Sequence, residues 1–232
     1  MPPSTNSILM LRQQELAQST RVFRARGSKL VRCEDCLLAK PDCFCAAKPT
    51  LASDCGFCFL VYKGEAYKPS NTGRLIADVA PDNHAFLWQR TQQDTRMLAL
   101  LNDPAYAPMV VFPHEYAEPE RCVHSLQQVQ GFQHGKKPLF IMLDGTWREA
   151  KKMFRSPYLA TLPVLGIQPG QGSRYLMRDT ALQHQLCTAE VGIELLKLAG
   201  EPAVAAALSD YFDTFCRNYT KVKPHLLDKQ RA

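Results

Sequence analysis

A short apolar run that ends abruptly in a carboxylate constrains the fold more than any other part of this chain. Residues 139–143 (LFIML) have the length of a buried strand, and a helical pattern follows over 147–155. The two are joined by Asp144-Gly145-Thr146-Trp147, which places an acid, a hydroxyl and a large aromatic ring at the tip of the strand. Because open α/β sheets bind ligands at this edge, the stretch predicts a site for a small molecule or a base. The alternative is an acid or hydroxyl that only caps the next helix.

The same alternation of short apolar runs and helical patterns extends through most of the chain after residue 56. Further strand candidates are 57–62, 85–88, 109–112 and 162–167, with helical patterns at 72–80 and 93–101. Helical stretches are also predicted at 8–26, 188–200 and 202–219, whereas 114–137 shows no clear pattern. Strands that alternate with helices predict an α/β fold with a mostly parallel sheet flanked by helices.

Four of the nine cysteines are spaced as metal ligands. Cys33 and Cys36 form a C-x-x-C turn, and Cys43 and Cys45 follow closely. Four thiolates in this pattern predict a closed tetrahedral zinc site, which would fold a segment too poor in apolar residues to fold alone. An iron–sulfur cluster is the alternative for four cysteines. The chain is therefore predicted to contain a basic N-terminal helix and a zinc-binding element over residues 1–56, and a catalytic domain over 57–232.

The other cysteines are predicted to be structural. Cys55 and Cys58 form a second C-x-x-C, which is also the spacing of a redox pair. This pair opens a predicted strand, whereas redox pairs stand at a helix start that lowers the pKa of the thiol. One of the two is expected to face the core and the other a loop. Cys122, Cys187 and Cys216 are isolated and fit the role of small apolar fillers.

Positive charge gathers near the two ends of the chain, whose net charge is +6. The residues are Arg12, Arg21, Arg24, Arg26, Lys29 and Arg32 near one end, and Lys221, Lys223, Lys229 and Arg231 near the other. Two basic ends suit a polyanion such as RNA, although charged termini also serve only to keep a protein in solution. No apolar run approaches the roughly 20 residues of a membrane span, and the N-terminus lacks the apolar core of a secretory signal. A cytoplasmic protein without a membrane partner is expected.

Several polar groups have a local explanation and a functional one. The segment Asn71-Thr72-Gly73-Arg74 lies between a strand and a helix, so it either caps that helix or binds a carboxylate or phosphate. Tyr175 and Arg178 fit a turn, and Thr188 and Glu190 fit a capped helix start. Individually, none of these residues identifies a function.

Taken together, these residues resemble the DTW-domain family, and within it the bacterial tRNA-uridine aminocarboxypropyltransferases. The resemblance runs from Arg32 to about Tyr219. It is carried by the cysteine cluster, Asn71-Thr72-Gly73, the Val-Val-Phe-Pro stretch that ends at Pro113, Asp144-Gly145-Thr146-Trp147 with Ala150 and Met153, Tyr175 and Arg178, and Thr188 and Glu190. Their occurrence in the family's order is more specific than any one of them.

The resemblance implies a fold, a reaction and a partner. The fold would be similar to SPOUT-type methyltransferases, with a C-terminal knot that binds S-adenosylmethionine. The reaction would move the 3-amino-3-carboxypropyl group of S-adenosylmethionine to N3 of a uridine in the tRNA variable loop and release methylthioadenosine. A methyltransferase on the same scaffold and a non-catalytic zinc-containing RNA-binding module are the alternatives. A monomer is expected.

The chemistry of the implied reaction suggests a role for each residue of the site. Asp144 would be the base that takes the N3 proton, with its pKa raised by partial burial. Thr146 would hydrogen-bond the uracil edge or the cofactor, and Trp147 would pack the turn or the adenosine. The cofactor would be held by Asn71, Thr72, Gly73, Arg74, Pro113, Tyr175, Arg178, Thr188 and Glu190, with its carboxylate on Arg178 and the Asn71–Arg74 helix start and its amine on Glu190. Glycines 166, 170 and 172 would cradle the adenine, and the N-terminal helix and zinc element would bind tRNA.

Overall fold

A parallel sheet forms the centre of the molecule. In the computed structural model, which describes residues 6–20, 30–129, 135–167 and 186–221, six strands are arranged in the order β2-β1-β5-β3-β6-β4. Their bounds are Gly56–Val61 (β1), Asn83–Leu87 (β2), Tyr106–Val111 (β3), Cys122–Val123 (β4), Lys137–Asp144 (β5) and Val164–Leu165 (β6). Every pair of neighbours is parallel, which confirms the predicted α/β class.

Strand β5 occupies the middle of this sheet and carries the predicted acid at its end. It pairs with β1 on one side, where Val61 lies opposite Asp144, and with β3 on the other, where Val111 lies opposite Met142. Strands covered on both faces read as continuous apolar runs, which is why residues 57–62 and 139–143 could be recognised from the sequence. The carboxyl ends of β1, β3 and β5 therefore form one edge beside Asp144.

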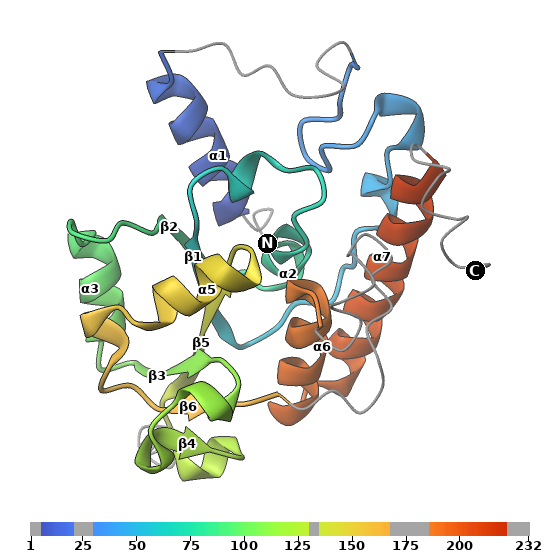
Figure 1. The fold of residues 1–232 in the computed structure, drawn as a ribbon. Helices are drawn as coiled ribbons and strands as arrows, with labels where there is room; N and C mark the ends of the chain where they lie inside the picture. The colour runs from blue at the N-terminus through green and yellow to red at the C-terminus, as the bar shows by residue number, and fades with distance from the viewer. Residues whose placement is uncertain (1–5, 21–29, 130–134, 168–185, 222–232) are drawn as a thin grey trace, which may run out of the picture.

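Helices cover both faces of the sheet (Figure 1). Their bounds are Ser7–Gln18 (α1), Gly73–Val79 (α2), Thr95–Leu101 (α3), Trp147–Phe154 (α5), Thr188–Leu198 (α6) and Pro202–Lys221 (α7). Residues of α1, α2, α6 and α7 share an apolar cluster with Phe57, Phe59 and Phe140 of the sheet. Residues of α3 and α5 share a second cluster with Leu60 and Ile141, which point to the opposite face because strand side chains alternate.

The cysteine segment packs on the same face as α7. Cys36, Leu38 and Phe44 belong to the same apolar cluster as Ile8 of α1 and Phe57 of β1. The Asn218 side chain on α7 also donates a hydrogen bond of 3.2 Å to the carbonyl oxygen of Asp42. Residues from both sides of the predicted boundary at 56/57 are thus joined in one core.

Some predicted elements differ in length from the observed ones. The N-terminal helix predicted over 8–26 ends at Gln18, because Ser19 adopts an extended conformation. The strand predicted over 162–167 has only two residues, and the two-residue strand β4 lies within the stretch without a clear pattern. The knot was expected in the C-terminal part of the chain, where residues 168–185 and 222–232 lie outside the described residues. Among the described residues, no helix has the length and apolar character needed to cross a membrane.

Candidate active site and metal centre

Three residues that are distant in the sequence meet at the carboxyl end of β5. Asp144 is the last residue of this strand and only 5% exposed. The side-chain amide of Asn71 donates to its Oδ2 at 2.5 Å, and the hydroxyl of Thr188 donates to its Oδ1 at 3.2 Å. The structure therefore brings together one predicted catalytic residue and two predicted cofactor-binding residues, from β5, the loop before α2 and the start of α6.

Backbone contacts fix the relative positions of these segments. The Asn71 Oδ1 atom accepts a hydrogen bond of 3.3 Å from the backbone N–H of Arg74. The Thr72 Oγ1 atom accepts one of 3.2 Å from the N–H of Ala189, which connects the start of α2 to the start of α6. A Cβ atom at Gly73 would lie 3.3 Å from Asp144 Oδ2, so the absence of a side chain keeps this carboxylate oxygen accessible from α2.

Two further carboxylates, those of Glu65 and Glu149, lie near Asp144 at this end of the sheet. The pKa of Glu65 is raised, mainly by burial and in part by the negative charges of Asp144 and Glu149, while its ion pair with Lys68 opposes this. The Glu149 Oε2 atom accepts hydrogen bonds from the Thr146 N–H at 2.7 Å and from the Thr146 hydroxyl at 2.6 Å. Thr146 thus begins α5 as the capping alternative predicted, and the edge is rich in negative charge.

An aromatic cluster with cations lies on the other side of the Asp-Gly-Thr-Trp turn. Trp147 stacks on Phe112 with a centroid distance of 5.2 Å and contacts Tyr116 edge-on at 5.4 Å. Lys151 lies over both Tyr116 and Trp147, at 5.3 and 5.4 Å from the ring centroids. The predicted cofactor residue Pro113 precedes the turn His114–Tyr116, and its carbonyl oxygen accepts the N–H of Tyr116. Pro113 therefore directs the chain from β3 into this cluster.

A polar hollow adjoins these rings. It has a volume of about 310 Å³ and is lined by Phe112, Tyr116, Glu118, Arg121, Lys151, Phe154, Arg155, Ser156 and Ala160. Helix α5 also exposes Arg148, Lys152 and Arg155 to solvent. This basic face was not predicted from the sequence. Four basic residues within one turn or two of the Asp-Gly-Thr-Trp motif were the signal that could have revealed it.

The remaining predicted cofactor residues have other neighbours or lie outside the described residues. The buried Glu190 accepts a hydrogen bond of 2.8 Å from the N–H of Cys187 and caps the start of α6. Gly166 donates its N–H to His114 Nε2 at 2.9 Å, and a Cβ atom there would lie 2.8 Å from that ring. Glycines 170 and 172, Tyr175 and Arg178 fall within residues 168–185, outside the described part of the chain.

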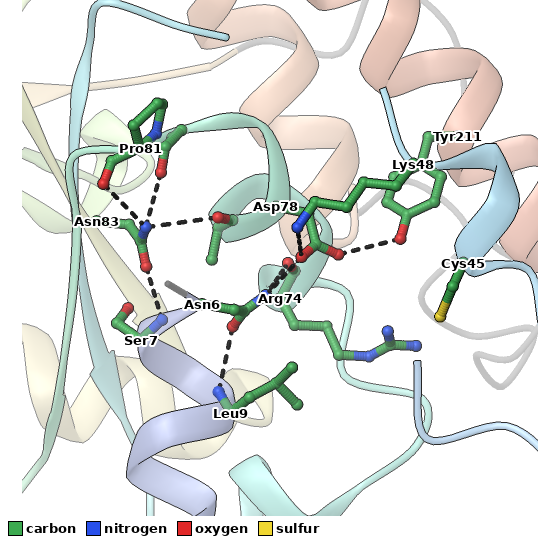
Figure 2. A network of polar contacts seen from close by, with 12 residues as sticks. Asn6, Ser7, Leu9, Cys45, Lys48, Arg74, Asp78, Pro81, Asn83 and Tyr211 are labelled. Carbon is green, nitrogen blue, oxygen red and sulfur yellow. Dashed lines mark hydrogen bonds and ion pairs between the residues drawn. The ribbon is translucent and has the colours of Figure 1, made fainter. Parts of the chain in front are cut away.

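Arg74 starts beside the Asp144 site, but its guanidinium lies elsewhere. Figure 2 shows the side chain extending from α2 toward Cys45 and Tyr211. Its Cζ atom lies 5.2 Å from the ring centroid of Phe215 and 5.6 Å from that of Phe44. Burial lowers the pKa of this guanidinium. Because it faces these rings, we do not include Arg74 among the groups that would hold the cofactor carboxylate.

The four cysteines of the predicted zinc site form a compact cluster. All their Sγ atoms lie within 4.8 Å of one another, with 3.6 Å between Cys33 and Cys45 and 3.7 Å between Cys36 and Cys43. Zn–S bonds of about 2.3 Å would place the sulfurs of a tetrahedron roughly 3.8 Å apart. The geometry therefore fits a four-coordinate metal ion, and all four positions of such an ion would be filled by sulfur, as expected for a structural site.

Local backbone contacts shape the cluster before any metal binds. The Leu37 N–H donates to the Cys33 carbonyl oxygen, and the Cys33 N–H donates to that of Leu38. Burial alone would raise the pKa of Cys33, but hydrogen bonds from the backbone at Cys36 and Asp35 lower it to about 7. Burial raises the pKa of Cys36 and of Cys45 in the metal-free cluster.

Comparison with known families decides where the chain belongs. The model of the DTW domain matches residues 30–220, which is most of the chain. This protein is a member of the DTW-domain family. The matched range begins just before Cys33, includes Asp144 and its hydrogen-bond partners, and ends in α7. No solved structure matches the chain.

The surroundings of Cys55 and Cys58, the second C-x-x-C of this DTW domain, indicate a structural role. Cys55 and Cys58 are both buried, and burial raises the pKa of each to about 12. Their side chains lie in the two different apolar clusters, one on each face of the sheet. Cys58 faces the core as predicted, and Cys55, although covered, donates at 3.4 Å to Glu201 in the loop between α6 and α7. The structural interpretation of the pair is retained.

Proposed function

We propose that this DTW-domain protein transfers the 3-amino-3-carboxypropyl group of S-adenosylmethionine to N3 of a uridine in the variable loop of tRNA. The observation that carries the proposal is the Asp144 carboxylate at the end of the central strand, held by Asn71 and Thr188. Family membership is consistent with a role in tRNA modification. The particular reaction rests on the resemblance described above and on the chemistry that this site supports.

The reaction needs a base and an oriented electrophile. Uridine N3 carries a proton at neutral pH, so a group within hydrogen-bond distance must accept it as N3 attacks the Cγ carbon of the cofactor. The N3–Cγ bond forms, the Cγ–S bond breaks, and the sulfur keeps the electron pair in neutral methylthioadenosine. Asp144 is suited to this proposed role because its place at the strand end and its contacts with Asn71 and Thr188 hold the carboxylate in a defined orientation.

The charge around the site matches the charge of the cofactor. Asp144, Glu65 and Glu149 place negative charge at one edge of the sheet. S-adenosylmethionine carries a sulfonium, and a positive centre is favoured near carboxylates that are partly withdrawn from water. The sulfonium becomes a neutral thioether in the reaction, so the same carboxylates favour release of the product.

The basic face of α5 supports a tRNA substrate. We define this face as Arg148, Lys151, Lys152 and Arg155, which follow directly on the Asp-Gly-Thr-Trp turn. Arginine and lysine side chains bind the phosphate backbone, while aromatic rings stack on unpaired bases. Trp147 and Tyr116 lie beside this face and would stack on the bases of a loop whose uridine is turned toward Asp144.

An incubation with two labelled cofactors tests the proposed function. Unmodified tRNA is mixed with the protein and with S-adenosylmethionine labelled either in the methyl carbon or in the carboxypropyl carbons. We expect label in the RNA only from the carboxypropyl carbons, and methylthioadenosine as the by-product. Methyl label in the RNA would replace the proposal with a methyltransferase, and no label would indicate an RNA-binding module.

A further inference from the structure

Arg74 has a buried side chain, and two of its three guanidinium nitrogens have no hydrogen-bond partner among the described residues. It is only 1% exposed and is among the largest fully buried side chains. Within the described residues, neither its Nε nor its Nη1 atom has a hydrogen-bond partner, and its Nη2 atom reaches only the Pro69 carbonyl oxygen at 3.4 Å. A buried guanidinium remains charged and presents its donors in the plane of the group, so it requires an anion.

The carboxylate closest to this side chain is occupied by other donors. Asp78 receives Lys48 at 3.0 Å, the Asn6 amide at 3.0 Å and the Tyr211 hydroxyl at 3.0 Å (Figure 2). Among the described residues, Arg74 forms no ion pair with any carboxylate. The rings of Phe44 and Phe215 cover the faces of the guanidinium, but they accept no hydrogen bond from its edge.

The cysteine cluster supplies the missing anion once it holds a metal ion. Four thiolates around Zn²⁺ carry a net charge of about −2, and metal-bound sulfur accepts hydrogen bonds. Arg74 is close enough to Cys36 and Cys45 for their charge to affect its pKa. Phe44, whose ring lies beside the guanidinium, is the residue between Cys43 and Cys45 in the sequence. In Figure 2 its guanidinium points toward Cys45.

We propose that Arg74 is the positioning cation of the metal–thiolate site, and that it connects this site to Asp144. The connection is short, because the N–H of Arg74 donates to the Asn71 side chain that donates to Asp144. Metal binding would hold the Arg74 side chain and with it the start of α2. The inference rests on the cysteine cluster binding a metal, and it is independent of which group the enzyme transfers.

The test compares Arg74→Met with the wild type for zinc affinity and for stability. Zinc affinity is measured by competition with a chromophoric chelator, and stability by urea unfolding with and without zinc. We expect Arg74→Met to bind zinc at least tenfold more weakly, as for other partners of metal ligands. The zinc-free variant should be at least as stable as the zinc-free wild type, because it no longer buries an uncompensated charge.

Two further variants make the result decisive. Arg121→Met is the matched control, because Arg121 also lies over an aromatic ring but packs on the opposite face of the sheet, beside Phe154. Its zinc affinity should equal that of the wild type. Arg74→Lys keeps the positive charge and should bind zinc with an affinity between those of the wild type and Arg74→Met. If Arg74→Met does not fold, the zinc affinity of Arg74→Lys still tests the proposal. Unchanged zinc affinity in both Arg74 variants would overturn the proposal, as would equal losses of stability with and without zinc.

Discussion

At the scale of single residues, the most informative contact is the one between Asn71 and Asp144. It joins a loop and a strand that are 73 residues apart and orients the carboxylate at 2.5 Å. The side-chain amide of Asn71 can adopt only one of its two flipped orientations here. Its oxygen accepts from the Arg74 N–H, so its nitrogen must be the atom that donates to Asp144. The orientation of the Asn71 amide thus holds Asp144 Oδ2 as the acceptor of its N–H group.

Replacement of this acid tests the base directly. We expect Asp144→Asn to lower carboxypropyl transfer by at least about 100-fold, because general bases contribute roughly that much. The new side chain can keep its oxygen on the Asn71 amide and direct its nitrogen to the Thr188 hydroxyl, which can also accept, so stability should change by less than about 1 kcal/mol. Transfer is measured under single-turnover conditions with bound cofactor, and Thr188→Val serves as a control that removes only one hydrogen bond to the carboxylate. Full transfer by a folded Asp144→Asn protein would exclude the base role.

The sequence singled out the residues that meet at this carboxylate, but it did not predict how their side chains are arranged. Asn71 and Thr188 both contact Asp144, whereas the roles of these residues as base and cofactor-binding residues stay predictions. Arg74 belongs to the same helix start, yet its side chain turns toward Phe44 and Phe215. The direction of a buried arginine depends on residues that are adjacent only after folding, and no local pattern encodes it.

At the scale of elements, the site depends on the close approach of α2 and α6. Gly192 of α6 faces Ile76 of α2, and a Cβ atom at position 192 would lie 2.5 Å from Ile76 Cδ1. Near their starts the two helices are joined by the hydrogen bond that the Ala189 N–H donates to Thr72 Oγ1. The glycine therefore sets the spacing that allows Asn71 and Thr188 to reach the same carboxylate.

A methyl group at this contact should separate the helices. We expect Gly192→Ala to lower the free energy of unfolding by about 1–2 kcal/mol, because the clash in a packed core exceeds the gain of about 1 kcal/mol in helix propensity. Urea unfolding measures the change, and the cost should largely vanish when Ile76→Ala is already present. Lys197→Ala, on the exposed part of α6, is the control. An equal cost in both backgrounds would show that the contact with Ile76 is not responsible.

A second contact between elements gives the fold a dependence on pH. Asp82 accepts hydrogen bonds from Lys137 at 2.7 Å, from His84 at 2.9 Å and from Tyr106 at 2.9 Å, at the amino ends of β5, β2 and β3. Burial would raise its pKa, but these donors outweigh burial and lower it. A carboxyl with a lowered folded pKa contributes stability above its unfolded pKa of about 3.9, and this contribution is lost as the pH falls further.

This contribution is measurable by substitution. We expect Asp82→Asn to lower the free energy of unfolding by about 1–2 kcal/mol at pH 7, an amount suited to hydrogen bonds with a partly exposed charged group. The difference from the wild type should stay nearly constant down to about pH 4 and shrink as the pH falls from about 4 toward 2, measured by urea unfolding at each pH. Tyr106→Phe removes one donor and should cost less. A constant difference across this range would show that the charge of Asp82 has no part in the effect.

Strands and helices differed in how far the sequence could define them. The buried strands β1 and β5 were predicted nearly to the residue, because each is a continuous apolar run. Strands β4 and β6 have two residues each, which is too short for any periodic pattern, so one was missed and the other was predicted too long. Short strands of this kind form because neighbouring strands offer hydrogen bonds, and that information lies outside their own residues.

At the scale of the whole molecule, the two faces of the sheet contribute different groups to the edge beside Asp144. The face covered by α2 and α6 supplies Asn71 and Thr188 to Asp144, and it continues into the cysteine cluster through Arg74. The opposite face carries α5 with its basic residues and Trp147. The order of the strands brings these regions together, and strand order cannot be read from hydrophobic periodicity.

This division predicts where the tRNA phosphates lie. The sequence placed RNA binding on the N-terminal helix and zinc element, but Arg21, Arg24, Arg26 and Lys29 lie outside the described residues, whereas the basic face of α5 adjoins the site. We expect the double variant Arg148→Gln and Lys152→Gln to bind tRNA more weakly, with S-adenosylmethionine affinity unchanged. If both residues contact phosphates, the slope of log affinity against log salt should become shallower by about 1.5.

The salt dependence separates this explanation from a general loss of positive charge. Lys197→Gln combined with Arg217→Gln removes the same charge from α6 and α7, away from α5, and should leave the slope nearly unchanged. Both proteins are titrated with unmodified tRNA between low and physiological salt. Equal slopes for the two double variants would mean that tRNA does not dock on α5. A shallower slope for the α5 variant alone would place the phosphates beside Trp147, within reach of a uridine turned toward Asp144.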